Sequence, residues 1–193
     1  KVVYPGVEVD EPTAADIKNA RQKFGLDGPF ILTVGKLEPR KNIRRLIQAF
    51  LDLGNSDLEL AIVGPSGWDD LKTQAKNVKF LGYVSDRELF SLYKSSLFFI
   101  FPSLWEGFGY PLVEAMKLGT PAAVSENSSL KEIGRGAVLF FDPANTDSIK
   151  NAIQKMAGSD SLRRGLSRKG KERAKEFSWH KAYDRIISIL TAK

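Results

Sequence analysis

Short apolar runs alternate along this chain with stretches in which apolar residues recur at helical spacing. Six runs have the length and composition of buried strands, at residues 30–34, 58–63, 77–81, 97–101, 121–124 and 138–141. The first three run into Gly35, Gly64 and Gly82, a residue type typical of the turns that close strands. The opening residues 1–7, KVVYPGV, also have a strand-like pattern and predict a strand entered in mid-chain, as in a fragment of a longer protein.

Helices are predicted between these runs. After Asn42, which stands where a helix cap is expected, apolar residues follow at the spacing of one helix face: Ile43, Leu46, Ile47 and Phe50. Ser85, with Glu88 three residues later, forms a capping box ahead of a second helix. Proline suits the first turn of a helix, so Pro111 indicates a third helix. Two or three more helices are expected to end the chain.

Strands that alternate with helices at this spacing predict an α/β fold. We expect a Rossmann-like, doubly wound parallel sheet of about six strands, with helices on both faces. Right-handed crossovers place the strand-to-helix loops at the carboxyl edge of such a sheet, where ligands bind. The loops of interest are therefore residues 35–42, 64–69, 82–86 and 102–110. The 193 residues, 42% of them hydrophobic, fit a single domain over residues 1–193.

The net charge of +6 changes this picture only at one end of the chain. Residues 160–193, the predicted basic terminal helices, hold 10 Lys/Arg and 4 Asp/Glu, which leaves 19 of each sign in the rest. The simplest interpretation is a solvated helix face. A second is peripheral contact with an anionic membrane on its cytoplasmic face. A nucleic-acid partner is not expected, because no aromatic residues interleave the cations. The lack of cysteine fits a cytoplasmic protein.

The loop after the first strand, GKLEPRKN (35–42), combines a glycine with the cations Lys36, Arg40 and Lys41. These cations precede a helix N-terminus, where free N–H groups attract anions, so the loop can hold a diphosphate. By itself it could also be a solvated basic loop.

The loop after the fourth strand, WEGFGYPLVEA (105–115), places Glu106 and Glu114 around a glycine turn. A carboxylate can accept two hydrogen bonds from neighbouring hydroxyls of a sugar or ribose. Gly107 and Gly109 allow the backbone to approach a ligand closely. Alternatively, Glu114 only favours the helix dipole and Glu106 is an ordinary loop residue. Hydrolysis by the two carboxylates is disfavoured, because no third polar group nearby in the sequence would position a water.

Five segments in one order resemble the C-terminal half of a family 4 retaining glycosyltransferase of the GT-B fold. They are the Pro-Gly-Val segment at 2–7, VGKLEPRKN (34–42), FLGYVSDREL (80–89), PSLWEGFGYPLVEAMKLGTPAAVS (102–125) and FSWHKAYDRI (177–186). In relatives the last of these packs back against the N-terminal domain. The resemblance implies a domain that binds a nucleotide-sugar donor, whose partner is an acceptor-binding N-terminal domain that this chain does not contain.

The resemblance also implies roles for individual residues. Glu106 would hold the donor sugar, Glu114 the ribose hydroxyls, and Lys41 the leaving diphosphate. Lys36 stands where the family usually has arginine, which keeps the charge but loses the guanidinium fork. Glu106, Lys41 and Lys36 would be catalytic. The other donor contacts would come from Gly35, Arg40, Gly64, Gly82, Tyr83, Val84, Gly107, Phe108, Gly109, Tyr110 and Glu114, with Tyr83 and Val84 beside the nucleobase.

The implied reaction transfers a hexosyl group with retention, in polysaccharide or glycolipid biosynthesis. The family's reaction implies no metal ion and no cofactor, and the domain alone is expected to be inactive. GDP-mannose is the favoured donor, and a UDP-sugar is the alternative. A non-catalytic nucleotide-binding or scaffold module also stays open. A dinucleotide-dependent oxidoreductase is disfavoured, because Gly-Lys-Leu-Glu-Pro replaces the glycine fingerprint after the first strand.

Overall fold

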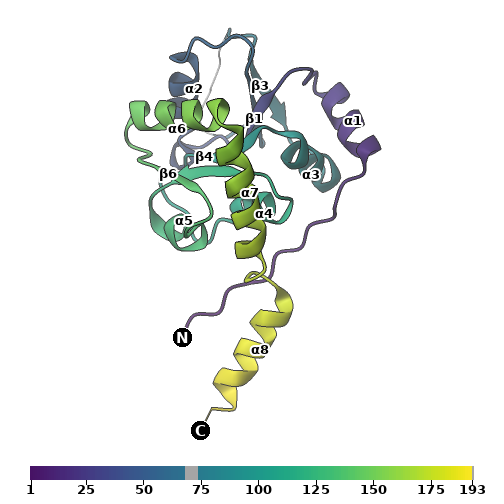
Figure 1. Cartoon of the computed structure of the whole chain (residues 1–193), viewed down its shortest axis with the longest axis vertical. Coiled ribbons are helices and arrows are strands. Elements are labelled where there is room, and N and C mark those ends of the chain that lie inside the picture. The colour runs from purple at the N-terminus through teal and green to yellow at the C-terminus, as the bar shows by residue number, and fades with distance from the viewer. Residues whose placement is uncertain (68–73, 193) are drawn as a thin grey trace.

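Parallel strands form one sheet at the centre of the molecule, flanked by helices (Figure 1). The structure is a computed structural model that describes residues 1–67 and 74–192. Within these residues the sheet has six strands: β1 (Phe30–Val34), β2 (Glu59–Val63), β3 (Val78–Gly82), β4 (Phe98–Phe101), β5 (Ala122–Ser125) and β6 (Leu139–Phe141). All six predicted strands and their parallel arrangement are confirmed, with boundaries that differ by no more than about one residue.

The described helices are α1 (Ala14–Lys23), α2 (Ile43–Leu51), α3 (Asp86–Ser95), α4 (Tyr110–Lys117), α5 (Ser128–Ile133), α6 (Thr146–Gly158), α7 (Asp160–Ala174) and α8 (Trp179–Leu190). A 3₁₀ turn, Pro39–Lys41, precedes α2. The capping box of Ser85 and Glu88 at α3 is confirmed, and three helices end the chain. The sequence pattern did not predict α1 or α5, although Thr13 and Asp16 form a capping box at the start of α1.

The core lies on both faces of the sheet. Along β1 the side chains of Phe30 and Leu32 join one apolar cluster, and the intervening Ile31 joins the other. The first cluster contains residues of α3, α4 and α5, and the second contains residues of α2 and α6. This alternation is what a strand buried on both faces requires, and it confirms the doubly wound α/β fold.

The strand order is β3-β2-β1-β4-β5-β6. The chain first winds from β1 outward through β2 to β3, then returns to the middle and winds the other way from β4. β1 and β4 are neighbours, paired at Ile31–Phe98 and Leu32–Phe99, and the loops that follow them lead to α2 and α4 on opposite faces of the sheet. A crevice opens between such loops at the carboxyl edge, and this switch point is where doubly wound sheets bind ligands.

The predicted strand at residues 1–7 is wrong. The segment crosses the surface outside the sheet, and its Val7 N–H donates to the carbonyl of Phe177, at 3.2 Å. Gly6 lies so close to the start of α8 that a Cβ there would be 2.4 Å from the nitrogen of Trp179. Pro5 cannot donate to a strand ladder, which is one reason why this apolar stretch pairs with the α7–α8 corner and not with a sheet edge.

Asn42 is the N-cap residue of α2, as predicted, but it does not cap the helix with its side chain. Its backbone is left-handed, with φ 58°, and its side chain makes no capping bond. Instead its buried amide donates to the carbonyls of Pro102, at 3.1 Å, and Pro143, at 2.8 Å. The side chain thus bridges the loops after β4 and β6.

Helix α8 extends away from the body of the molecule, at the same end as the N-terminus (Figure 1). Its side chains Trp179, Tyr183 and Leu190 are exposed. Among the described residues, no helix has the length and apolar character needed to cross a bilayer.

Candidate functional site at the switch point of the sheet

The loops after β1 and β4 meet at the switch point. The Leu104 N–H donates to the Arg40 carbonyl at 2.8 Å, so the two backbones are joined directly. Residues 39–41 form the 3₁₀ turn that ends the first loop, and residues 102–109 form the second. The sequence separates these loops by about sixty residues, and only the order of the strands makes them neighbours.

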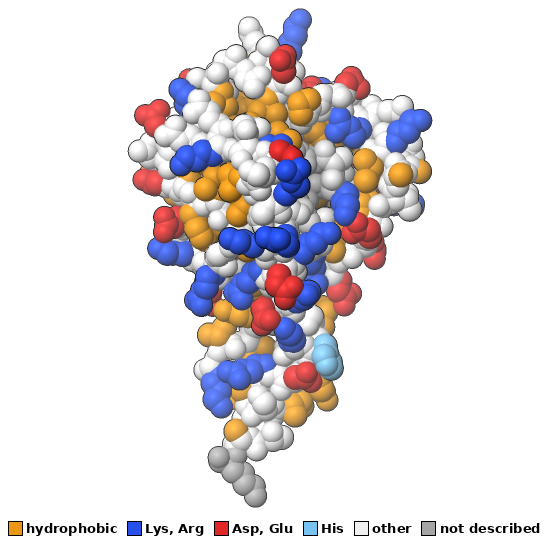
Figure 2. Space-filling view, viewed as in Figure 1, with side chains coloured by type: hydrophobic (Ala, Val, Ile, Leu, Met, Phe, Trp, Pro, Cys, Tyr) orange, Lys and Arg blue, Asp and Glu red, His pale blue; other side chains and the backbone are white. Residues whose placement is uncertain are grey.

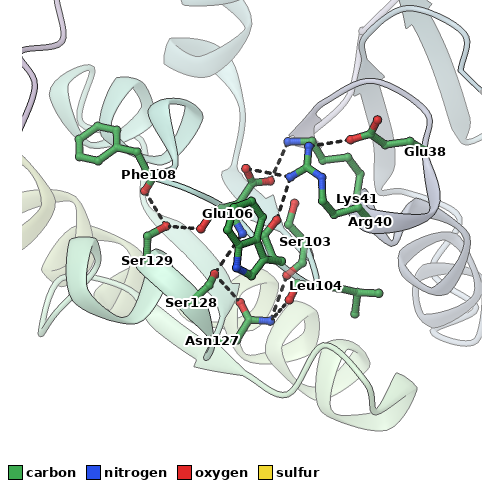
Figure 3. Close-up of polar contacts among 11 residues, drawn as sticks. Glu38, Arg40, Lys41, Ser103, Leu104, Glu106, Phe108, Asn127, Ser128 and Ser129 are labelled. Atoms are coloured by element: carbon green, nitrogen blue, oxygen red, sulfur yellow. Dashed lines mark hydrogen bonds and ion pairs between the residues drawn. The ribbon is translucent and has the colours of Figure 1, made fainter.

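Glu106 is the centre of the site. Its carboxylate accepts from Lys41 Nζ at 2.7 Å and lies 3.2 Å from Nη1 of Arg40 (Figure 3). The side chains of Glu106 and Lys41 are only 10% and 11% exposed, so this ion pair is largely removed from water. The Lys41 ammonium also lies 5.0 Å from the centre of the Phe101 ring. A cation in this position is held both by a carboxylate and by an aromatic face.

Gly35 makes room for this lysine. A Cβ at Gly35 would lie 3.0 Å from Cδ and 3.1 Å from Cε of Lys41, so the lysine stem passes over the glycine. A side chain at position 35 would press on the lysine stem, which would have to shift to make room. The role of Gly35 in the structure is therefore to let Lys41 lie flat at the switch point.

Arg40 spans the site. Its guanidinium donates to the Trp105 carbonyl at 2.8 Å and to Glu38 at 2.6 Å, in addition to its pairing with Glu106. Burial works to lower the pKa of Arg40, but the charge of Glu106 and the hydrogen bonds to both carboxylates outweigh it, and the pKa is raised. Arg40 therefore stays charged and ties the loop after β1 to the loop after β4.

A short segment after β5 braces the glutamate loop from the other side, and the sequence interpretation missed it. Ser128 Oγ accepts from the Glu106 N–H at 3.1 Å. Ser129 Oγ lies 3.0 Å from the Glu106 carbonyl and 2.9 Å from that of Phe108, and Asn127 donates to the Leu104 carbonyl at 2.8 Å (Figure 3). The run Asn-Ser-Ser at 127–129, separated from the predicted strand 121–124 by two residues, is turn chemistry that could have revealed this brace.

This brace corrects one premise. The sequence interpretation disfavoured hydrolysis on the ground that no third polar group lies near the carboxylates, and Ser128 and Ser129 do lie near Glu106. Both hydroxyls, however, bond to the backbone of the loop. They fix the loop's shape and do not present a water to a carboxylate.

Glu114 lies on α4, and its carboxylate accepts from the Tyr93 hydroxyl of α3 at 3.2 Å. Burial raises the pKa of Glu114, the Tyr93 hydrogen bond opposes that rise, and the charge of Asp86 adds to it. Burial, followed by the charge of Glu114, raises the pKa of Tyr93 well above its usual value. The described contacts do not link Glu114 to Glu106, so the two carboxylates have separate environments.

The turn between the two glutamates owes its shape to Gly109. Its backbone has φ 99°, and a Cβ would lie 2.7 Å from a methyl of Leu130. Gly107 is exposed, whereas the Phe108 ring packs edge-on against Tyr110 and Phe177. The Phe108 side chain therefore belongs to the core, and only its main chain can face a ligand.

The remaining predicted residues lie at neighbouring loop ends. Lys36 is exposed after β1, and no ion pair among the described residues joins it to Glu106. Gly64 packs directly on the first loop, since a Cβ at this position would be 2.1 Å from the Gly35 oxygen.

The residues predicted to lie beside the nucleobase are at the end of β3. Gly82 is the last residue of this strand and has φ 67°. Tyr83 is 82% exposed, but the Val84 side chain is buried in the core, so only its backbone is available to a ligand. The far end of the 64–69 loop lies outside the described residues.

No cluster of three or more histidine, aspartate or glutamate side chains suited to a metal ion is found in the described part of the chain. Among the described residues, two cations, Lys41 and Arg40, lie around the Glu106 carboxylate, and Arg40 also pairs with Glu38. Such a site is suited to a ligand that carries both a negative charge and hydroxyl groups.

Fold and site together define a doubly wound α/β domain with a ligand site at its switch point. The family "Glycosyl transferases group 1" matches residues 16–173. O-antigen chain mannosyltransferase B of Escherichia coli is 36% identical over 170 residues, which cover 82% of this chain and 45% of that protein. The chain therefore belongs to the group 1 glycosyltransferase family.

Solved structures agree with this assignment. Sucrose-phosphate synthase of Thermosynechococcus elongatus matches with a TM-score of 0.77 at 25% identity, over 97% of this chain and 50% of that one. Anabaena HepE in complex with UDP and glucose matches with a TM-score of 0.82 at 21% identity, over 100% and 57%. The fold is thus the one seen in GT-B glycosyltransferases. The chain spans about half the length, or less, of the relatives that it matches.

Proposed function

We propose that this chain binds a nucleotide-sugar donor at the switch point and, together with an acceptor-binding N-terminal domain, transfers the hexosyl group with retention. The observation that carries the proposal is the position of Glu106, buried between Lys41 and Arg40 where the loops after β1 and β4 meet. A donor needs both charges at once, cations for its diphosphate and a carboxylate for its sugar.

The ion pair can open when the donor binds. A diphosphate carries more negative charge than one carboxylate and would compete with Glu106 for Lys41 and Arg40. Glu106 would then be free to accept hydrogen bonds from the sugar hydroxyls. Glu114, near the start of α4, would accept from the ribose hydroxyls, and the N–H groups of the 107–109 turn would face the phosphate. In the structure each group has a hydrogen-bond partner, and on this proposal the donor would replace it.

The chemistry follows from where charge develops. When the bond between the anomeric carbon and the diphosphate oxygen breaks, negative charge grows on the leaving oxygen. Lys41, with Lys36 and Arg40 on the same loop, would stabilise that charge from fixed positions. The acceptor hydroxyl would attack from the side of the leaving group and give its proton to the departing phosphate, which retains the configuration. The proposal includes no metal ion and no cofactor.

We favour a mannosyl donor carried by GDP. The support is the name of the relative at 36% identity, an O-antigen chain mannosyltransferase, and of a second at 31%, a serotype-specific mannosyltransferase. UDP-glucose is the alternative, because a structural neighbour was solved with UDP and glucose. That neighbour is only 21% identical, so its likeness supports the fold and not the donor.

Calorimetric titration of the purified chain tests the proposal. We expect GDP and GDP-mannose to bind at least about ten-fold more tightly than UDP and UDP-glucose, a difference of about 1.4 kcal/mol. Glu106→Gln should weaken binding of GDP-mannose more than binding of GDP, because it removes a sugar contact. Glu126→Gln, at an exposed surface glutamate, is the matched control and should change neither. Tighter binding of UDP than of GDP would identify a UDP-sugar as the donor. If no nucleotide bound, the proposed site would be refuted.

A transfer assay separates this function from a scaffold role. The chain alone should not transfer mannose, because nothing in it is proposed to hold the acceptor. Turnover by the chain alone would contradict that division of labour. If Glu106→Ala and Glu114→Ala left both donor affinity and the activity of the complete enzyme unchanged, a non-catalytic scaffold module would be the better assignment.

A further inference from the structure

An open groove of about 800 Å³ runs along α7, on the side of the sheet away from the donor site. Its floor includes Leu97 and Pro121, the residues just before β4 and β5, and so lies at the amino edge of the sheet. The donor loops lie at the carboxyl edge. This groove is therefore a separate surface, and the proposed transfer reaction does not use it.

The wall of the groove is a row of cations on one face of α7. Arg164, Arg168, Lys171 and Lys175 all line it, at spacings of four, three and four residues. Residues at these intervals lie along a single helix face. At a rise of about 1.5 Å per residue, the row is roughly 16 Å long. Figure 2 shows Lys and Arg side chains crossing the middle of this face of the molecule, over α7.

The ends of the row are partly neutralised, and its centre is not. Arg164 pairs with Asp160, and Lys175 pairs with Glu172 at 2.6 Å, one turn or less away on the same helix. By contrast, no carboxylate among the described residues lies within ion-pair distance of Arg168 or Lys171. The centre of the row is thus the part that attracts an anion from solution.

The Lys171 stem is fixed on the groove floor. A Cβ at Gly119 would lie 2.2 Å from Lys171 Cε, and Ser167 donates to the Gly119 carbonyl at 2.6 Å. The lysine stem therefore lies along the turn after α4, in a groove that Leu97 and Pro121 also line, and Lys171 as a whole is exposed. A lysine stem beside apolar residues, with its charge able to reach water, is suited to the boundary between lipid headgroups and acyl chains.

We propose that this face of α7 docks the protein on the surface of an anionic lipid bilayer. Anionic lipid attracts clustered cations, and the apolar floor beneath the row favours a lipid surface over a purely polar partner. A single-stranded nucleic acid fits less well, because none of the described residues that line the groove is aromatic, and base stacking is what such binding needs. Docking by this face leaves the carboxyl edge, with the donor site, open to solution.

Flotation of the purified chain with vesicles tests the proposal. Vesicles of phosphatidylglycerol mixed with phosphatidylcholine should carry the chain, and phosphatidylcholine vesicles should not. Each cation near an anionic surface is worth about 1 kcal/mol, or roughly five-fold in partitioning, so Arg168→Gln/Lys171→Gln should weaken binding about twenty-five-fold. Raising the salt from about 50 mM to about 500 mM should release the wild type.

The matched control is Arg135→Gln/Lys155→Gln, which removes the same charge from two exposed positions outside the groove and should bind like the wild type. Equal binding to both kinds of vesicle, or an equal loss in the control, would overturn the proposal. Tighter binding of a fluorescent oligonucleotide than of the anionic vesicles, lost in the α7 variant alone, would assign the groove to nucleic acid and also overturn it. GDP affinity should not change in the α7 variant, so a failure here is distinguishable from a failure of the donor site.

Discussion

Replacing Lys41 by methionine tests the ion pair at the switch point most directly. Methionine keeps an unbranched stem of similar length over Gly35 but leaves Glu106 without its nearest cation. Removing one partner of a buried pair costs about 3–5 kcal/mol. We expect the low end, about 3 kcal/mol of the free energy of unfolding, because Arg40 remains 3.2 Å from the other oxygen of Glu106.

A second variant separates stability from function. Lys41→Met/Glu106→Gln removes both charges, so no ion is left buried without its partner, and most of the lost stability should return. Donor binding should not return, because the phosphate has lost a cation and the sugar has lost its carboxylate. Urea denaturation measures the first quantity, and calorimetric titration with GDP-mannose measures the second.

Lys181→Met is the matched control. Lys181 also pairs with a glutamate at 2.7 Å, but both side chains are about half exposed, and its loss should leave the unfolding free energy close to that of the wild type. Our reasoning would be refuted if the single and double variants were equally unstable, or if the double variant bound GDP-mannose as tightly as the wild type does.

Three further changes probe the surroundings of the site. Burial raises the pKa of Glu114, so ionising this group destabilises the folded state as the pH rises above the ordinary glutamate value. The stability of Glu114→Gln relative to the wild type should therefore increase between about pH 4 and pH 7. A difference in unfolding free energy that stays constant over this pH range in urea titrations would contradict this. Gly109→Ala should lower the free energy of unfolding by more than about 1 kcal/mol, because the backbone has φ 99° and a methyl of Leu130 would lie 2.7 Å from the new Cβ. Gly165→Ala inside α7 has open space around the new Cβ, and thermal unfolding should show it to be neutral or stabilising. Ser129→Ala removes the hydroxyl that lies within donating distance of the Glu106 and Phe108 carbonyls, and it should lower GDP-mannose affinity several-fold, while exposed Ser161→Ala should not. Equal affinities in the two variants would rule out the brace.

Periodicity predicted the strands most clearly where they are buried on both faces, as β1 and β4 are, because such a strand is an almost unbroken apolar run. The same signal failed at residues 1–7, where an apolar run contains Pro5 and pairs with the carbonyl of Phe177. Periodicity reports that a segment is buried, but it does not identify the neighbour that buries it.

The charged residues of the site could be predicted, but their pairing could not. Lys41 and Glu106 each stood out as the kind of residue that a loop after a strand uses for binding. Their contact at 2.7 Å depends on β1 and β4 being adjacent, and the order of strands is a long-range property that no local pattern contains. Tyr93 was missed for the opposite reason, because a tyrosine inside an apolar helix face looks like any other core residue until its hydroxyl is seen to reach Glu114.

The amide of Asn42 has a consequence for how this edge of the sheet can evolve or be redesigned. One side chain holds the carbonyls of Pro102 and Pro143, which lie 60 and 101 residues away along the chain. The loops after β1, β4 and β6 meet at this side chain, so lengthening or exchanging any one of them would break a contact that the other two share. Attempts to graft a new specificity onto this domain should therefore transplant the three connections as a set, with the asparagine that fastens them.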